Sequence, residues 1–221
     1  MTEKLKTNTD TNFLKLIGII TMTIDHIGLI LFPNISILRV IGRIAFPIFA
    51  YGIAVGSVYT KDIKKYLLRL AILAVLFQVV YTLRCLPDWT NTFFQLNIFF
   101  TLSFGLACII GIQQKKWWLT AICLIASFFL NIDYGYGGVL LIITFYIFRN
   151  KPLISAIMVA PQLLCMQIDR FLIYGLSIQS FSIFSMPFIY MKTNFNLKIN
   201  KYVFYVFYPL HFLVLYLISI F

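Results

Sequence analysis

Long apolar runs with very few charges are the feature that most constrains what this 221-residue chain can fold into. A helix that crosses a bilayer needs roughly 20 mostly apolar residues to cover a hydrocarbon core about 30 Å thick. The sequence contains nine candidate spans: 13–32, 37–59, 66–83, 95–112, 117–131, 135–148, 152–168, 171–191 and 202–221. The connections between them are short. The sequence therefore predicts an all-α fold, a polytopic integral membrane bundle of about nine transmembrane helices.

Composition excludes the other broad classes of protein. Hydrophobic residues make up 61% of the chain and charged residues 11%, whereas soluble domains are about half apolar and a quarter charged. The four cysteines (Cys85, Cys108, Cys123 and Cys165) show no paired spacing, so we expect neither disulfides nor a metal site. We expect a flexible polar N-terminus over residues 1–12 and a single transmembrane domain over residues 13–221.

Basic residues predict the orientation of the chain, because Lys and Arg in short loops stay on the cytoplasmic side. With a cytoplasmic N-terminus the outer loops hold Arg84 and Arg170 alone. The inner segments hold fourteen: Lys4, Lys6, Lys15, Lys61, Lys64, Lys65, Arg69, Lys115, Lys116, Arg149, Lys151, Lys192, Lys198 and Lys201. The net charge of +11 is thus a topology signal, and no nucleic-acid partner is expected. We predict a multi-pass protein of the bacterial cytoplasmic (inner) membrane, surrounded by lipid, with an extracytoplasmic C-terminus.

The spans 117–131 and 135–148 are short. At 1.5 Å per residue they reach about 21–23 Å, less than the thickness of the hydrocarbon core. They are either two thin spans or one re-entrant pair, and removing both leaves the orientation of every other segment unchanged. The turn over residues 133–138 is expected to lie below the outer surface.

Five ionisable residues lie inside the predicted spans: Asp25, His26, Arg39, Arg43 and His211. Each costs about 2.5–3.5 kcal/mol to insert, so such groups need partners and usually mark function. The hairpin between the first two spans brings Asp25 and Arg43 to similar depths, and Arg39 lies on the same helix face as Arg43. Adjacent helical residues point about 100° apart, so we assign Asp25 to the arginines rather than to His26.

A structural interpretation of the same residues stays open. Asp25 and Arg43 could form an ion pair that locks the first two helices together, and His26 could be a satisfied core histidine. His211 could bond backbone carbonyls that Pro209 leaves without a donor. The functional interpretation combines an imidazole base with two guanidinium groups, which suits acyl transfer. In that interpretation Asn97 and Asp133 are placed with His211 in a substrate pocket, and no metal takes part.

Six segments together resemble one known family, the TraX family, which is named for the acetylase of conjugative F-pilin. They extend over nearly the whole chain and follow one another in order. Written out, they are LKLIGIITMTIDHIG (14–28), LRVIGRIAFPIFA (38–50), KYLLRL (65–70), NIFFTL (97–102), DYGYGGVL (133–140) and FYVFYPLH (204–211).

The resemblance implies an inner-membrane acetyltransferase that takes its acetyl group from acetyl-CoA. The acceptor it implies is the N-terminal amine of a pilin or another peptide; a hydroxyl, as in a glycan, is the other possibility. The chain is similar, more distantly, to wider membrane acyltransferases, which share a basic residue and a histidine separated by ten intervening residues; Lys15 and His26 match that spacing. Lys15 would then contact CoA phosphates, unless it is an ordinary interfacial anchor. Where family members often carry a glutamate, this chain has Gln78, which we also place in the pocket.

The sequence thus predicts an acetyl-CoA-dependent N- or O-acetyltransferase. His26 is the expected base, Arg39 and Arg43 stabilise charge, and Asp25 orients the arginines. A proton-coupled small-molecule transporter is the alternative, because buried carboxylate and imidazole groups can also relay protons. A non-catalytic membrane assembly factor is a third possibility, and it would tolerate loss of His26 and Arg43 together.

Overall fold

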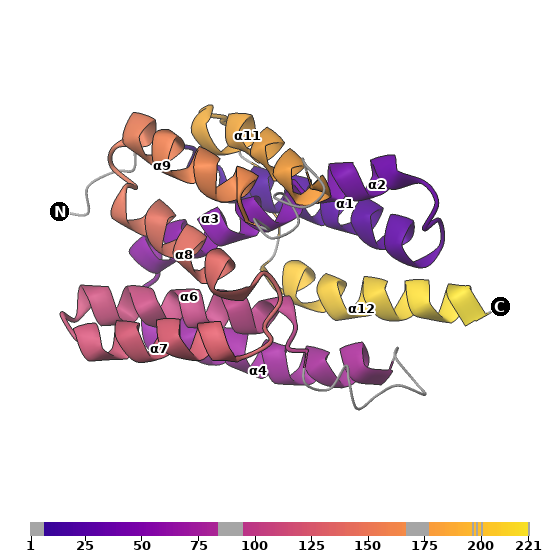
Figure 1. Ribbon diagram of the computed structural model, residues 1–221, viewed down its shortest axis with the longest axis horizontal. Helices are drawn as coiled ribbons and strands as arrows, with labels where there is room; N and C mark the ends of the chain where they lie inside the picture. The colour runs from indigo at the N-terminus through magenta and orange to yellow at the C-terminus, as the bar shows by residue number, and fades with distance from the viewer. Residues whose placement is uncertain are drawn as a thin grey trace. The chain divides into compact units, whose positions relative to one another are not determined.

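The fold is helical, as predicted, in a computed structural model that describes residues 7–83, 95–166, 177–195, 197, 199 and 201–220. These residues contain no β-strand, apart from one isolated bridge between Leu96 and Ile132. The elements, labelled in Figure 1 where there is room, are α1 (Thr11–Ile30), α2 (Ser36–Gly42), α3 (Ala45–Tyr59), α4 (Ile63–Leu83), α6 (Ile98–Gln113), α7 (Trp117–Phe129), α8 (Gly135–Ile147), α9 (Pro152–Leu164), the 3-10 helix η1 (Ile178–Ser185), α11 (Met186–Tyr190) and α12 (Lys201–Ile220).

The chain divides into two compact units. Unit 1 combines Met1–Gly52 with Phe148–Phe221, and unit 2 is Ile53–Ile147, so the boundary falls inside α3. The expectation of a single transmembrane domain over residues 13–221 stays a prediction.

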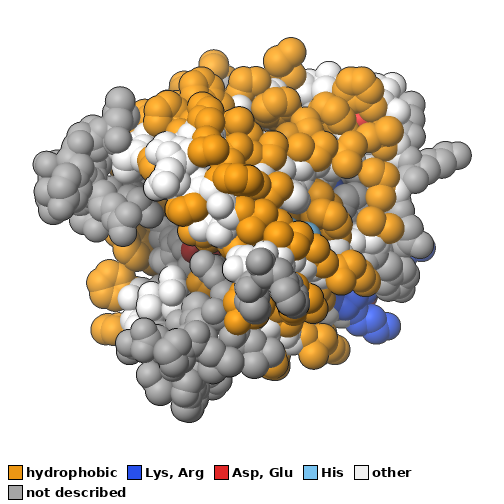
Figure 2. Space-filling model, turned by 90° about the vertical axis from the view of Figure 1, so that its right-hand side faces the viewer, with side chains coloured by type: hydrophobic (Ala, Val, Ile, Leu, Met, Phe, Trp, Pro, Cys, Tyr) orange, Lys and Arg blue, Asp and Glu red, His pale blue; other side chains and the backbone are white. Residues whose placement is uncertain are grey.

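Among the described residues, two segments are long and apolar enough to cross a membrane, by length and composition: Thr11–Ile30 and Ser36–Tyr59. The shorter apolar helices include α6, α7, α8 and α9. Large hydrophobic side chains are exposed along α4, such as Leu68 and Leu76 at 59% and 62%, and Figure 2 shows hydrophobic side chains spread widely over one face. These are features of a membrane-associated helical protein, whereas the nine-span topology stays a prediction.

The second predicted span, 37–59, is interrupted. Helix α2 ends at Gly42 and α3 begins at Ala45. At the junction the amides of Arg43 and Ile44 bond three residues back, to the carbonyls of Val40 (3.2 Å) and Ile41 (3.3 Å), which tightens the last turn. Pro47 explains the break: it has no N–H to donate to the Arg43 carbonyl, and its ring would clash with that carbonyl in a continuous helix.

The predicted span 171–191 also departs from one continuous α-helix. Residues 171–176 lie outside the described residues, and those that follow form η1 and α11, which run antiparallel to α9. The Ser180 hydroxyl donates to the carbonyl of Leu164 (3.2 Å), while the Tyr190 hydroxyl contacts the Ser155 hydroxyl (2.8 Å) near the start of α9. Pro187 lies in the first turn of α11 and has no N–H for the Ile183 carbonyl, which accepts instead from the Met186 amide at the end of η1.

Of the segment 1–12, which the sequence predicts to be flexible, the structure describes residues 7–12, and these make contacts with distant parts of unit 1. Residues 1–6 lie outside the described residues. Asn8 is buried, and its Nδ2 donates to the Phe188 carbonyl (2.8 Å). One carboxylate oxygen of Asp10 accepts from the Phe13 amide (3.3 Å) and caps α1, and the other accepts from the Phe195 amide (2.8 Å). Phe188 and Phe195 lie 180 and 185 residues from their partners in the sequence, so the sequence pattern could not reveal these contacts.

In unit 2, α6 packs against α4, α7 and α8, and its antiparallel neighbour α7 can be followed in Figure 1. The Leu96–Ile132 bridge ties the start of α6 to the turn that follows α7. Cys108 and Cys123 are buried free thiols in the apolar core of this unit, Cys165 of unit 1 is an exposed free thiol, and Cys85 lies outside the described residues.

Candidate active site

A carboxylate that bridges two arginines lies at the centre of unit 1. Asp25 of α1 is buried, and its Oδ2 and Oδ1 accept from Arg39 Nη1 (2.7 Å) and Arg43 Nη2 (2.5 Å). Arg39 Nη1 also donates to the Asp25 carbonyl (3.2 Å). Charge-assisted hydrogen bonds of this kind are the strongest that side chains make. The contact predicted between Asp25 and the arginines is therefore present.

The approach of α1 to α2 depends on a residue without a side chain. A Cβ placed at Gly42 would overlap Cβ, Cγ and Oδ1 of Asp25. One turn further along α1, a Cβ at Gly28 would overlap the Leu38 Cβ. Glycines at both points let the two helices pack closely enough for one carboxylate to reach both guanidinium groups.

Arg43 is held by further hydrogen bonds. Its Nε donates to the Arg39 carbonyl (3.2 Å), and its Nη1 donates to Oε1 of Gln179 on η1 (3.2 Å). Gln179 is 3% exposed. Sequence reasoning missed Gln179; its signal was a lone amide within the apolar segment 171–191. Gln179 links the third element of the site, η1, to the ion-pair cluster.

The two histidines of the chain contact each other. Nδ1 of His26 and Nε2 of His211 are 2.8 Å apart, and the rings stack with centroids 5.1 Å apart and planes 12° from parallel. Nδ1 of His211 lies 2.9 Å from the Phe207 carbonyl, which can only accept. Nδ1 of His211 therefore carries a proton, and in the neutral ring Nε2 of His211 is an acceptor. This acceptor faces Nδ1 of His26, so His26 carries its proton on Nδ1. In the neutral form of His26 the lone pair is then assigned to Nε2.

The environment of His26 is aromatic and partly exposed. The Phe212 ring meets the His26 ring edge-on at 5.2 Å, and the Tyr208 ring does so at 6.3 Å. Aromatic walls lower the local dielectric and strengthen electrostatic interactions. The Asp25 cluster combines one carboxylate with two guanidinium groups, so its formal charge is positive. His26 follows Asp25 directly in the sequence. The site can thus accept a proton and stabilise a developing negative charge.

Five of the predicted site residues form two contacting groups in unit 1: Asp25 with Arg39 and Arg43, and His26 with His211. Lys15 lies on the same continuous helix as His26, about 16 Å away along the helix axis. None of these positions tests a catalytic or cofactor-binding role, and the roles stay predictions.

Gln78 and Asn97 form a polar network in unit 2. Gln78 Oε1 accepts from the Asn97 amide (3.0 Å) and from Asn97 Nδ2 (2.8 Å), and Gln78 Nε2 donates to the Gln95 carbonyl (3.0 Å). Asn97 also caps α6 through the Phe99 amide. The side chain of Asp133 is exposed, and its carbonyl accepts from the Thr101 hydroxyl. Among the described residues, no three His, Cys, Asp or Glu side chains gather in a metal-binding group.

Fold and site define a helical, membrane-associated protein with a buried Asp–Arg–Arg cluster and an adjoining histidine pair. The sequence profile of the TraX family, described as "TraX protein", matches residues 10–219, and the chain belongs to that family. An uncharacterised protein of Rickettsia prowazekii (strain Madrid E) is 55% identical over 40 residues, which cover 18% of this chain and 16% of that relative. No solved structure matches the chain.

Proposed function

We propose that this protein is a membrane-embedded acetyltransferase that moves an acetyl group from acetyl-CoA to an amine, such as a peptide or pilin N-terminus, or to a hydroxyl. The observation that carries the proposal is the His26–His211 hydrogen bond beside the Asp25–Arg39–Arg43 cluster. Membership of the TraX family supports it, because the family is named for a pilin acetylase. The proposed location is the bacterial inner membrane.

Proton transfer follows from the tautomers of the two histidines. As the acceptor nitrogen or oxygen attacks the thioester carbonyl, His26 Nε2 takes its proton, while Nδ1–H stays bonded to His211. The new C–N or C–O bond forms, the C–S bond breaks, and the proton on Nε2 passes to the CoA sulfur. His211 stabilises the transient imidazolium of His26 because its neutral ring presents a lone pair to Nδ1–H.

Charge stabilisation falls to the arginines. The tetrahedral intermediate of acyl transfer carries an oxyanion, and preorganised positive charge in a water-excluded site stabilises such a group by about 3–4 kcal/mol per donor. Asp25, Gln179 and the Arg39 carbonyl fix the Arg43 guanidinium before the reaction. In this proposal Asp25 is a positioning residue.

The donor site extends the proposal to Lys15. Lys15 would bind the CoA phosphates at the inner face, about 16 Å along α1 from His26. Asp133, Gln78 and Asn97 belong to unit 2, and their placement in a substrate pocket stays a prediction. Asp133 is exposed, whereas the side-chain amides of Gln78 and Asn97 are engaged with protein groups.

Acetyl transfer by purified protein tests the proposal. Radiolabelled acetyl-CoA is supplied with a panel of peptides bearing free or blocked N-termini. His26→Ala is expected to lower transfer by about 10²–10⁴-fold. His211→Ala should cause a smaller loss, which His211→Gln partly restores because an amide oxygen can accept from Nδ1–H. Thr23→Ala, on the same helix, is the matched control and should retain wild-type transfer. Normal transfer by folded His26→Ala protein would refute the mechanism.

A proton-coupled transporter is the second candidate, because the same pair of hydrogen-bonded imidazoles could relay protons. Binding of acetyl-CoA distinguishes the two candidates. Calorimetry on the detergent-solubilised protein should show micromolar binding that Lys15→Ala weakens. Absence of binding, together with uptake driven by a pH gradient in proteoliposomes, would favour the transporter.

A further inference from the structure

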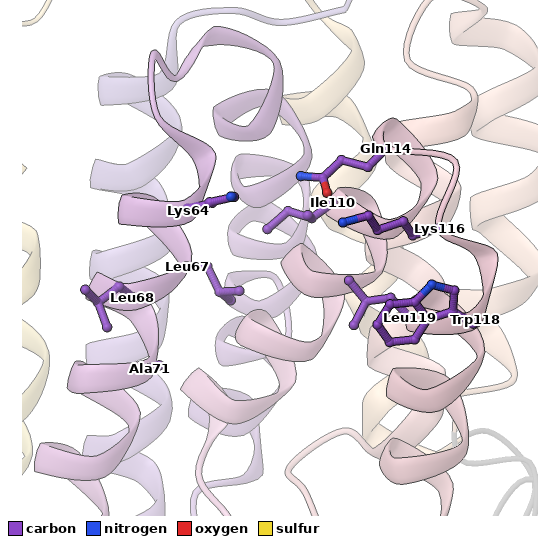
Figure 3. A pocket seen from close by; sticks show the side chains of 9 residues that line it. All are labelled: Lys64, Leu67, Leu68, Ala71, Ile110, Gln114, Lys116, Trp118 and Leu119. Atoms are coloured by element: carbon purple, nitrogen blue, oxygen red, sulfur yellow. The ribbon is translucent and has the colours of Figure 1, made fainter.

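A pocket of about 450 Å³ opens among α4, α6 and α7, entirely within unit 2 (Figure 3). It lies at the end of the unit where α4 begins and where α6 turns into α7. The predicted topology places this end at the cytoplasmic face. The proposed acetyltransferase site of unit 1 uses none of the residues of this pocket.

One end of the pocket is positively charged. Lys64 and Lys116 line it with Gln114, and their side chains extend toward one another from opposite sides in Figure 3. The turn after α6 aims Lys116 inward: Lys115 adopts a left-handed conformation (φ 57°), and the Lys116 amide donates to the Gly111 carbonyl (2.8 Å). Within the part of the chain that the structure describes, the ion pair near this end joins Lys65 to Asp62, and neither Lys64 nor Lys116 takes part in it.

The other end of the pocket is apolar and open. Leu67, Trp118 and Leu119 line it. Trp118 is 61% exposed, as an aromatic side chain at a membrane interface is expected to be. The outer face of α4 continues the apolar surface along the helix through Leu68, Ile72 and Leu76, all at least half exposed. Two ammonium groups above a continuous apolar face match a phosphate that carries hydrocarbon chains.

We propose that this pocket binds the headgroup phosphate of an anionic phospholipid, with its acyl chains lying against the exposed face of α4. Basic pockets between helices on the cytoplasmic side are suited to lipid headgroups of this kind. CoA also carries phosphates, but its long polar pantetheine arm matches the apolar continuation of the pocket less well than acyl chains do. The proposal does not depend on the acetyltransferase activity.

Native mass spectrometry of the detergent-solubilised full chain tests the site, with phosphatidylglycerol and phosphatidylcholine of identical acyl chains as probes. The wild type is expected to retain one phosphatidylglycerol about tenfold more tightly than phosphatidylcholine. The double variant Lys64→Gln/Lys116→Gln should lose that preference. The control Lys65→Gln/Lys115→Gln removes the same charge from neighbouring positions outside the pocket and should keep it. Thermal unfolding midpoints confirm that each variant is folded.

Three outcomes would overturn the proposal. Equal retention of the two lipids would show that no headgroup site exists. Equal loss in the pocket and control variants would show a general effect of surface charge. Displacement of phosphatidylglycerol by CoA or inorganic phosphate at micromolar concentration would assign the two lysines to a soluble phosphate ligand.

Discussion

At the scale of single residues, the site depends on the contact between Gly42 and Asp25. Gly42→Ala would insert a methyl group into the space that the Asp25 side chain occupies. We expect Asp25 to lose at least one arginine and the variant to lose most acetyl transfer, together with about 1–3 kcal/mol of stability from overpacking. Gly52→Ala is the control, because a Cβ there meets no atom within 4 Å.

Thermal unfolding and transfer assays on both glycine variants check this prediction. A Gly42→Ala protein with wild-type stability and activity would show that Asp25 can move without consequence. Such a result would show that the site does not require the close approach of α1 and α2.

Gln78 supports a second prediction, because its side-chain amide both accepts and donates hydrogen bonds in the network of unit 2. A carboxylate could accept from Asn97 as Gln78 does, but it could not donate to the Gln95 carbonyl. Gln78→Glu would therefore leave a buried acceptor facing another acceptor, at a cost of about 1–3 kcal/mol. Chemical denaturation in detergent should show this loss, and a larger loss in Gln78→Met, which leaves the Asn97 amide and the Gln95 carbonyl without their Gln78 partners. Greater stability in Gln78→Glu than in the wild type would contradict the hydrogen bond from Gln78 to the Gln95 carbonyl.

Some contacts of the site could be predicted from the sequence and others could not. The pairing of Asp25 with Arg39 and Arg43 followed from helical spacing and from the cost of burying charge. The partner of His26 did not, because His211 lies 185 residues away and no local pattern joins the two. Gln179 escaped notice for the same reason: its significance lies in the position of Arg43, which depends on tertiary packing.

At the scale of elements, apolar runs in the sequence predict where helices lie, whereas proline determines where the helix over 37–59 is interrupted. Segment 66–83 was predicted as one helix and is one, α4, which begins at Ile63. Segment 37–59 has the same apolar character, yet Pro47 divides it into α2 and α3. Hydrophobicity reports which residues avoid water, whereas the missing N–H of proline controls whether the backbone can continue a helix.

The start of α4 offers a prediction on pH. Oδ1 of Asp62 accepts from the Lys65 amide (3.0 Å), and this hydrogen bond is the main cause that lowers the pKa of Asp62 below its usual value of 3.8. A lowered pKa in the folded state means that the cap stabilises α4 above about pH 4 and is lost as the pH falls through the folded pKa. Hydrogen exchange at the first turn of α4 should accelerate over that range, after correction for the intrinsic rate.

Asp62→Asn is the control for this pH dependence. Asparagine caps helices about as well as aspartate but does not titrate. Protection of the first turn should then become independent of pH, while Asp62→Ala should lower protection at every pH. An unchanged pH dependence in Asp62→Asn would assign the effect to another group.

At the scale of the whole molecule, contacts within unit 1 bear on the predicted topology. The segment that precedes α1 contacts α11 and the segment that follows it: Asn8 bonds Phe188 of α11, and Asp10 bonds Phe195. The two segments therefore lie on the same side of any membrane that α1 crosses. The antiparallel path of η1 and α11 beside α9 leads the chain back to that side, and α12 starts from it. This path agrees with the distribution of Lys and Arg, which places both segments in the cytoplasm.

Two measurements check this topology. Alkaline phosphatase fused after Phe221 should be active and green fluorescent protein fused there should be dark, because a single further crossing by α12 places the C-terminus outside. Single cysteines at Thr9 and Met191, both exposed, should resist a membrane-impermeant reagent in intact cells and react after permeabilisation. The fusion result does not depend on whether 117–131 and 135–148 cross fully, since they form an adjacent pair. A fluorescent, phosphatase-inactive C-terminus would mean that α12 does not cross or that segment 171–191 does not, and would refute the nine-helix arrangement.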